Sequence, residues 1–311
     1  MLKRWAFVLS ALFLLSAGTV PSAFAQAPMK LTLAHGIASD FLVALVAKDK
    51  GIFEKHGLDV TLSVITNGAL APQALVSGSV QITFVSGPLL MLGEDGGLDL
   101  VVVSGMSRIQ KVNPHSSLIT KEGVSVTKAS DLIGKRVAVP GINSSLDLVF
   151  KKWLLDSGVR LDQVTSVELP FAQMGDALKS GQIDAAFPVE PMLARMLAGG
   201  GLARSVDIQS TVNPDFAASF WSSTREWATA NPKAVAAFRD AMAEALVFIR
   251  DNPQDAKAIE LAHLKFNDPN WPTFSLHVSP ADLQFWSAVC LQLKQIHKPI
   301  NGASLIFAGT P

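Results

Sequence analysis

Short apolar runs alternate with stretches of helical periodicity along most of the chain. The strand-like runs cover residues 30–35, 59–65, 80–85, 98–104, 117–120, 135–139, 164–169, 183–187 and 216–222. Between them, apolar residues recur with helical spacing over residues 41–50, 71–76 and 146–156. This alternation predicts a mainly parallel sheet covered by helices on both faces.

The alternation is interrupted once and then gives way to helices. Residues 108–116 are polar, and the pattern restarts at Asp131; from Arg225 onward the sequence reads as helical. Three of these helices begin at pairs that suit a helix start, Asn231-Pro232, Asn252-Pro253 and Ser279-Pro280. Because they lack strands of their own, we expect them to pack on the first half of the chain. The chain must then cross twice, near residues 117–124 and 214–222, which predicts a hinge.

A fifteen-residue pattern occurs twice in the chain. Residues 74–88 and 177–191 both fit A-L-x-S-G-x-[V/I]-x-x-x-F-x-x-x-P without a gap. In each copy a helix ends, a glycine (Gly78 or Gly181) closes it, a buried strand follows, and a proline suits the next helix start. The repeat predicts two similar α/β lobes that face each other, an arrangement suited to ligand capture.

These patterns together predict an α/β fold with two lobes, each a mainly parallel sheet flanked by helices. Two hinge crossovers join the lobes. We expect lobe 1 to comprise residues 26–119 and 218–311, and lobe 2 to comprise residues 120–217.

The first 25 residues have the three parts of a secretory signal peptide. Lys3 and Arg4 precede an apolar stretch over residues 6–15, and Ala23-Phe24-Ala25 forms a cleavage site. A retained N-terminal anchor is the alternative, but the apolar stretch is short for a membrane span. We expect cleavage before Gln26 and a soluble protein in the periplasm.

Composition removes several classes of function. Without Lys3 and Arg4 the chain has 24 basic and 26 acidic residues, so it lacks the positive charge that binds nucleic acid or anionic lipid. One cysteine, Cys290, excludes an internal disulfide, and its apolar helical surroundings predict a buried, inert thiol. The six histidines lack metal-ligand spacing. No metal, cofactor or catalytic residue is therefore predicted.

Three segments resemble periplasmic solute-binding proteins of ABC transporters. VAKDKGIFEKHGLDVTL resembles their A-K-x-x-G-x-F-x-x-x-G-L-x-V segment near the mature start. DLIGKRVAVPG resembles the D-L-x-G-K-x-V-x-V opening of the second lobe, and ALKSGQIDAAFPVEP resembles the A-L-x-x-G-x-[V/I]-D-A segment that ends in Glu-Pro. Their order is similar to the NMT1/THI5-like branch, which includes nitrate, taurine, alkanesulfonate and thiamine-precursor binders. Gln81 departs from the aspartate common there, which we interpret as a changed strand-facing polar contact.

The resemblance implies a two-lobed type II periplasmic-binding-protein fold that is open when empty and closed on its ligand. It implies a small-molecule ligand, either a sulfonate, a carboxylate or a pyrimidine-like solute. It also implies an ABC permease in the inner membrane as the partner, and we expect a monomer. Closure requires that the ligand contact both lobes at once.

Candidate ligand contacts follow from the loops that come after strands. In open α/β sheets, ligands bind beyond the carboxyl ends of strands, beside helix N-termini. Glycines there allow close approach, and free amides favour anions. The residues at such positions are Gly36, Ile37, Ser39, Asn67, Ser86 and Gly87 in lobe 1, and Asn143, Ser144, Ser145 and Glu190 in lobe 2.

Several of these residues have a structural alternative. The glycines could serve only as tight turns, and Ser39 (or its neighbour Asp40) and Ser144 could serve only as helix caps. His35 at a strand end is interpreted as structural. Phe84 and Phe187 hold the same repeat position and are interpreted as core residues.

Glu190 carries the most information about the ligand. Its carboxylate could simply complement the dipole of the following helix. If it faces the cleft, it disfavours a bare anion and favours a ligand with a positive charge or an N–H donor. This conflicts with the anion preference of helix N-termini, so the sequence leaves the charge of the ligand open.

Two other functions use the same fold. A ligand-sensing protein would dock its closed form on a membrane receptor. A thiamine-pyrimidine-synthase-like enzyme is the second alternative, but the chain contains no G-x-S-x-G, H-E-x-x-H, C-x-x-C or G-x-x-x-x-G-K-[S/T] motif. Solute binding is therefore favoured over catalysis.

Overall fold

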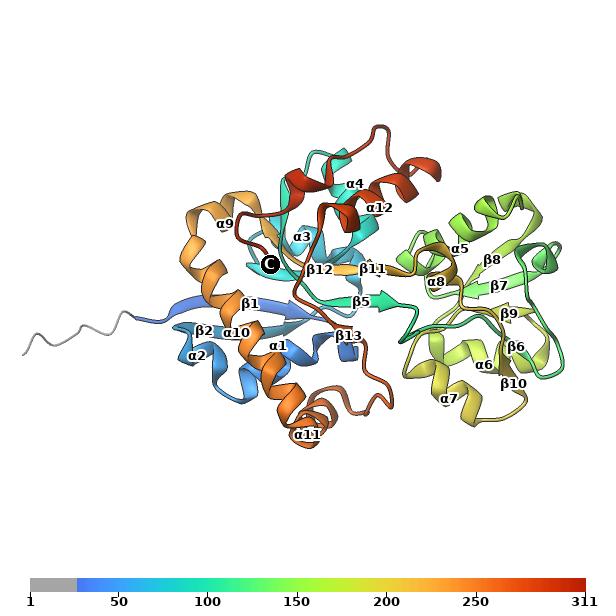
Figure 1. Cartoon of the computed structure of the whole chain (residues 1–311), viewed down its shortest axis with the longest axis horizontal. Coiled ribbons are helices and arrows are strands. Elements are labelled where there is room, and N and C mark those ends of the chain that lie inside the picture. Colours follow the sequence, from blue (N-terminus) through green and yellow to red (C-terminus); the bar gives the residue numbers. More distant parts are fainter. Residues whose placement is uncertain (1–26) are drawn as a thin grey trace, which may run out of the picture.

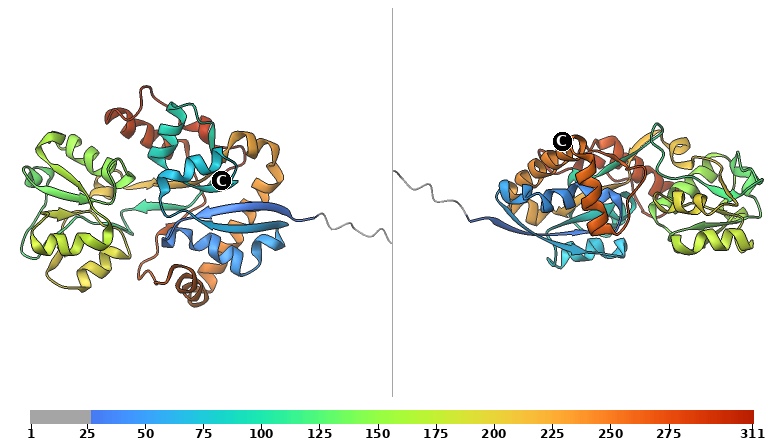
Figure 2. Two further views of the ribbon diagram at one scale, coloured as in Figure 1. Left: turned by 180° about the vertical axis from the view of Figure 1, so that it is seen from behind. Right: turned by 90° about the horizontal axis from the view of Figure 1, so that it is seen from below.

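The computed structural model describes residues 27–311, and the expected signal peptide lies outside the described residues. Two α/β lobes lie side by side and are joined by extended chain near the middle of the molecule (Figure 1). The views from behind and from below show the same division (Figure 2). The two-lobed α/β prediction is confirmed. The lobe boundaries expected at residues 119–120 and 217–218 stay predictions.

Lobe 1 contains a five-stranded sheet with the strand order β2-β1-β3-β12-β4, in which only β12 runs antiparallel to its neighbours. Its strands are β1 (Met29–His35), β2 (Leu58–Val64), β3 (Ile82–Ser86), β4 (Leu100–Gly105) and β12 (Ser219–Thr224). Its helices are α1 (Leu42–Asp49), α2 (Ile52–Lys55), α3 (Ala71–Val76), α4 (Gly87–Asp95), α9 (Arg225–Ala230), α10 (Pro232–Asp251), α11 (Pro253–Leu264) and α12 (Pro280–Gln292).

Burial on both faces explains why the lobe 1 strands read as continuous apolar runs. On β4, Val101 and Val103 belong to the core that includes α1 and α10, whereas Leu100 and Val102 belong to the core that includes α3, α4 and α12. Parallel sheets covered on both sides show this pattern. The C-terminal helices pack on lobe 1 as predicted, with α10 against α1 and α12 against α4.

Lobe 2 has a second five-stranded sheet, ordered β10-β6-β9-β7-β8. Its strands are β6 (Ile119–Lys121), β7 (Arg136–Val139), β8 (Thr165–Glu168), β9 (Ala185–Ala186) and β10 (Leu202–Arg204). Its helices are α5 (Ser145–Asp156), α6 (Phe171–Ser180), α7 (Met192–Ala198) and α8 (Ile208–Val212). The strands β7, β8 and β9 are parallel, and β6 runs antiparallel to β9 and β10.

A short three-stranded sheet forms the hinge. β5 (Ser107–Gln110) pairs antiparallel with β11 (Asp215–Ala217) on one side and with β13 (Thr273–Phe274) on the other. β5 lies partly in the polar stretch where the hydrophobic pattern predicts no strand. The single strand expected over residues 216–222 is two strands, and β13 contradicts the expectation of helices alone after Arg225. Strands this short carry almost no periodic signal.

The carboxyl edges of the two parallel sheets face each other across this hinge. On the lobe 1 side, β5 follows directly after the end of β4, and Ser219 at the start of β12 pairs with Ser86 at the end of β3. On the lobe 2 side, Ile119 at the start of β6 pairs with Ala186 at the end of β9. Both crossings therefore enter each lobe at its carboxyl edge, and the arrowhead of β1 points toward lobe 2 (Figure 1).

The sequence repeat corresponds to a repeated local structure. Gly78 and Gly181 both have left-handed backbones, with φ of +71° and +79°. Gln81 accepts a hydrogen bond from the Thr32 amide of β1 (2.8 Å), and Asp184 accepts one from the Arg136 amide of β7 (2.8 Å). Gln81 therefore makes the same kind of contact with β1, the strand beside β3, as Asp184 makes with β7, the strand beside β9.

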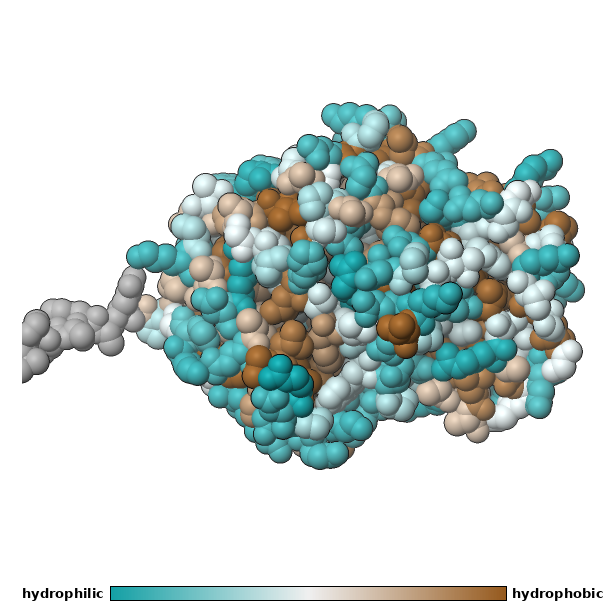
Figure 3. Space-filling model, viewed as in Figure 1, coloured by the Kyte–Doolittle hydropathy of each residue, from teal (hydrophilic) through white to brown (hydrophobic). Residues whose placement is uncertain are grey.

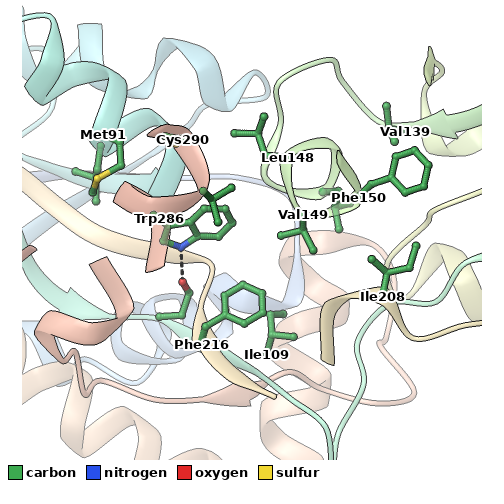
Figure 4. Packing of buried hydrophobic residues seen from close by; sticks show 14 of the residues in the cluster. Met91, Ile109, Val139, Leu148, Val149, Phe150, Ile208, Phe216, Trp286 and Cys290 are labelled. Carbon is green, nitrogen blue, oxygen red and sulfur yellow. Dashed lines mark hydrogen bonds between the residues drawn. The ribbon is translucent and has the colours of Figure 1, made fainter. Parts of the chain in front are cut away.

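Helix α12 connects the cores of the two lobes. It packs on α4 of lobe 1 and also contacts α5 of lobe 2. Trp286 and Cys290 of α12 belong to one apolar cluster with α5, whose Leu148 and Val149 lie on the side toward α12 (Figure 4). The indole Nε1 of Trp286 donates a hydrogen bond to the Ala217 carbonyl in hinge strand β11 (2.8 Å). Cys290 is buried as predicted, and burial raises the pKa of its thiol to about 12.

Candidate functional site

All the predicted contact residues lie at the two facing edges. Gly36, Ile37 and Ser39 follow β1, Asn67 follows β2, and Ser86 and Gly87 lie at the end of β3 and the start of α4. In lobe 2, Asn143 and Ser144 lie between β7 and α5, Ser145 begins α5, and Glu190 lies between β9 and α7. The topology therefore brings these loops to the two sheet edges that face each other across the hinge. Contact between any of them and a ligand stays a prediction.

Two glycines of the lobe 1 edge lie against aromatic rings. A Cβ atom on Gly36 would come within 2.8 Å of the Phe41 ring, and one on Gly68 within 3.1 Å of the Phe84 ring. Phe41 and Phe84 pack edge to face, with centroids 4.8 Å apart. The loop must be small here so that the aromatic pair can lie directly beneath it. Next to Gly36, the side chain of Ile37 is 58% exposed, so it offers an apolar surface at the edge.

Ser39 offers an unused hydroxyl. The helical segment begins with a short 3-10 turn (Ser39–Phe41) whose cap position is Ala38, so neither Ser39 nor Asp40 caps the helix as expected. The Ser39 side chain is buried, and its Oγ has no hydrogen-bond partner among residues 27–311. A buried polar atom without a partner costs free energy. A ligand that donates to or accepts from this hydroxyl would recover that cost.

Asn67 and Gly87, two further lobe 1 candidates, already have partners within the chain. Asn67 caps the 3-10 turn Gly68–Leu70, because its side chain accepts from the Ala69 amide at 3.1 Å. Gly87 is buried, and its amide donates to the Ala218 carbonyl at 3.0 Å. A Cβ on Gly87 would lie 2.1 Å from the Trp286 ring. The structure therefore gives Gly87 a packing role at the contact between α4 and α12.

In lobe 2 the loop before α5 is closed by carboxylates. Asn143 has a left-handed backbone with φ of +64°, and its amide donates to Asp147 Oδ2 at 2.7 Å. The Ile142 amide donates to Glu168 Oε2 at 3.1 Å. Ser144 caps α5 as its structural alternative predicts, accepting from the Asp147 amide at 3.3 Å. The amides that would face an anion at this helix start are partly occupied by the chain itself.

Glu190 is held inside lobe 2. It is buried, its Oε1 accepts from Arg204 Nη2 at 2.8 Å, and its Oε2 accepts from the Ala194 amide at 2.9 Å. Ala194 lies in the first turn of α7, so the carboxylate complements that helix start. Glu190 thus has the structural role that was its alternative interpretation. A ligand that contacts Glu190 would have to compete with Arg204 and the Ala194 amide.

His115 lies where the two lobes and the hinge meet. Its ring Nε2 is 3.2 Å from Asp268 Oδ2, and its carbonyl accepts from the Glu190 amide at 3.0 Å. Asp40 of lobe 1 accepts a hydrogen bond from Ser107 of β5 in the hinge sheet. Burial alone would lower the pKa of His115, but the bond to Asp268 and the charges of Asp40, Asp268 and Glu190 raise it overall. Sequence reasoning missed this cluster because His115 and Asp268 are 153 positions apart.

His35 and the repeat phenylalanines have the structural roles expected. His35 is buried, its Nδ1 lies 2.8 Å from the Gly36 carbonyl oxygen, and burial lowers its pKa. Phe187 is fully buried, and Phe84 is half-buried against the core of α1 and β1.

A separate apolar hollow of about 660 Å³ lies on lobe 1. It is lined by α10, the start of α11 and the segment around β13, where brown hydrophobic residues gather beside α10 (Figure 3). Among the described residues, no three acidic, histidine or cysteine side chains are grouped so as to hold a metal ion. Within residues 27–311, no helix has the length and hydrophobicity needed to cross a membrane.

Comparison with known proteins identifies the family and the fold of this chain. The family model described as "NMT1/THI5 like" matches residues 38–256. The chain belongs to the NMT1/THI5-like family. The crystal structure of the Escherichia coli periplasmic aliphatic sulphonate binding protein SsuA has the same fold, with a TM-score of 0.78 and 18% identity over 91% of this chain and 99% of that one.

Relatives of this NMT1/THI5-like chain include two binding proteins with higher identity. A binding protein of Brucella abortus is 29% identical over 238 residues, which are 74% of this chain and 70% of the relative. The taurine-binding periplasmic protein of Escherichia coli is 29% identical over 222 residues, which are 70% of this chain and 65% of that protein. The family resemblance and the periplasmic-binding-protein fold inferred from the sequence are confirmed.

Proposed function

We propose that this chain is a periplasmic solute-binding protein that captures one small organic molecule between its lobes and delivers it to an ABC permease. The observation that carries the proposal is the meeting of two carboxyl sheet edges across a hinge of short strands. A ligand held there touches both lobes, so its binding free energy favours the closed form. The buried Ser39 hydroxyl supplies a contact that the described part of the chain leaves unused.

Family membership supports the same role. The relatives named above are described as binding proteins, one for taurine and one for aliphatic sulphonates. A related protein from Halalkalibacterium halodurans is described as binding formylaminopyrimidine. These names support a screen of sulfonates and pyrimidine-like solutes, to which the expectation from the sequence adds carboxylates.

The remaining features of the proposal concern the state of the protein. We infer a monomer that is secreted to the periplasm after removal of residues 1–25, without a cofactor and without catalytic activity. One observation in favour of binding is that His115, which lies where the two lobes meet the hinge, is buried and paired with Asp268. A catalytic acid or base needs to reach the substrate.

A thermal-shift screen of these ligand classes tests the proposal. A true ligand should raise the unfolding temperature in proportion to the logarithm of its concentration, and calorimetry should give one ligand per chain. Small-angle scattering should show a more compact molecule when the ligand is bound. Conversion of the bound molecule to a product would contradict the proposal.

A matched pair of serine variants tests the site. Ser39→Ala should weaken the identified ligand by about tenfold, the loss of roughly one good hydrogen bond. Ser130→Ala, at an exposed position of lobe 2 away from the site, should bind like the natural protein. Equal affinity of all three proteins would place the ligand elsewhere.

A further inference from the structure

The anion-binding capacity of the lobe 2 loop is already used by the chain. Two successive amides before α5, those of Ile142 and Asn143, donate to the carboxylates of Glu168 and Asp147. Free amides at a helix start are the usual means of binding an anionic group. Here two carboxylates of the protein accept the amide hydrogen bonds that the oxygens of a sulfonate or carboxylate ligand would otherwise accept.

Two cationic side chains of lobe 2 already form ion pairs with carboxylates of the protein. Lys151 Nζ lies 2.6 Å from Asp147 Oδ2, and Arg204 Nη2 lies 2.8 Å from Glu190 Oε1. Glu168, by contrast, is exposed at the end of β8 and has no ion-pair partner among the described residues. Its one hydrogen bond there, to the Ile142 amide, leaves the other carboxylate oxygen available.

The loops that form the rest of the site add no positive charge. Residues 36–40, 67–70 and 86–87 of lobe 1 and residues 140–145 and 188–190 of lobe 2 contain no lysine or arginine. They do contain Asp40, whose partner is the neutral Ser107 hydroxyl. Among the described residues, Glu168 therefore adds an unpaired negative charge to the lobe 2 edge. On the lobe 1 edge, the charge of Asp40 acts on His115, whose pKa it helps to raise. An anionic ligand would be repelled from the lobe 2 side by Glu168.

Two buried polar atoms at these edges point to a ligand that donates hydrogen bonds. Asp147 is fully buried, and its Oδ1 has no partner among residues 27–311. The Ser39 Oγ on the opposite edge is also buried without a partner there. A carboxylate oxygen accepts only, and a hydroxyl can accept as well as donate. Both atoms can be satisfied by N–H groups.

We propose that the inter-lobe site selects a ligand whose lobe 2 end is cationic or rich in N–H donors, and that Glu168 is the residue that sets this preference. The inference rests on the proposed solute-binding function and decides between the charge classes that the sequence leaves open. Glu168 acts in two ways. It accepts the hydrogen bond of the Ile142 amide, so that an anion cannot bind there, and its free oxygen can accept a hydrogen bond from an N–H donor of the ligand. Hydrogen bonds between charged partners are stronger than neutral ones.

Three probes that share one ring test the charge preference: benzamidinium, benzamide and benzoate. Thermal shift and calorimetry should rank them in that order for the natural protein. Glu168→Ala should weaken benzamidinium by about tenfold or more and leave benzamide within about twofold. Glu122→Ala is the matched control, because Glu122 is exposed next to β6, at the opposite edge of the same sheet. Preferential binding of benzoate, or an unchanged affinity for benzamidinium in Glu168→Ala, would overturn the proposal.

A second measurement needs no organic ligand. Amide NMR resonances of Ile142 and Asn143 should not move when sulfate is added to the natural protein or to Glu122→Ala. In Glu168→Ala the freed Ile142 amide should shift with sulfate in a saturable way. Equal shifts in all three proteins would show that the amides are open to anions and would overturn the inference. Failure of the proposed function looks different: no ligand of any charge class would raise the unfolding temperature.

Discussion

Replacing Gly87 by alanine tests whether this residue packs against α12 or serves the ligand. The added Cβ would lie 2.1 Å from Trp286 Cδ1 and 2.3 Å from both Cγ and Nε1. The indole cannot simply retreat, because it is completely buried and its Nε1 donates to the Ala217 carbonyl of hinge strand β11. Relief of the clash therefore requires movement of α12, of α4 or of the hinge.

The cost follows from two contributions. Overpacking a dense core costs about 1–3 kcal/mol, and loss of a buried hydrogen bond to Ala217 adds about 1 kcal/mol. We therefore expect Gly87→Ala to lower the free energy of unfolding by about 2–4 kcal/mol. Urea denaturation followed by tryptophan fluorescence measures this change as a lower midpoint.

Gly93→Ala provides the control within the same helix. A Cβ on Gly93 meets Leu100 Cδ1 at 3.5 Å, an ordinary contact. This variant should gain about 0.5–1 kcal/mol, because alanine is the better helix former. If Gly87→Ala unfolds at the same urea concentration as the natural protein, the packing argument is refuted. If its stability is unchanged while ligand affinity falls, Gly87 is a ligand contact after all.

Three further predictions follow from single side chains. Ser39→Ala should leave the free energy of unfolding unchanged or raise it by up to about 1 kcal/mol, because it removes a buried hydroxyl without a partner; urea denaturation measures this. The stabilisation from protonated His115 should be complete below its ordinary pKa of 6.5 and lost as pH rises through its raised folded-state pKa; unfolding temperatures of the natural protein and His115→Gln should converge at high pH. Cys290, with its pKa raised to about 12, should not react with a thiol reagent at neutral pH until the protein unfolds.

Each of these predictions has a clear contrary result. A large loss of stability in Ser39→Ala would mean that the hydroxyl has a structural role. If the difference in unfolding temperature between His115→Gln and the natural protein instead grows with pH, Asp268 and its neighbours do not stabilise the protonated form of His115. Rapid labelling of Cys290 in the native protein would show that α12 detaches readily from the contact between the lobes.

Much of the fold could be predicted because its signals are local. Gly78 and Gly181 have the left-handed backbone that a glycine after a helix predicts. The apolar runs predicted central strands such as β4 because both faces of the sheet are buried there. The placement of candidate contacts at strand ends also followed from the sequence, since in a parallel sheet the loops after the strands lie at one edge.

The sequence by itself determined the two-lobed α/β architecture and the sheet edges at which the candidate contact residues lie, because periodicity, turn residues and the repeat are encoded within short segments. Only the tertiary structure decided which polar groups are free. It joined His115 to Asp268 across 153 positions and placed the Glu168 carboxylate on the Ile142 amide. It also filled the space beside Gly87 with Trp286. Such contacts form between segments that are distant in the sequence, so a local sequence pattern does not predict them.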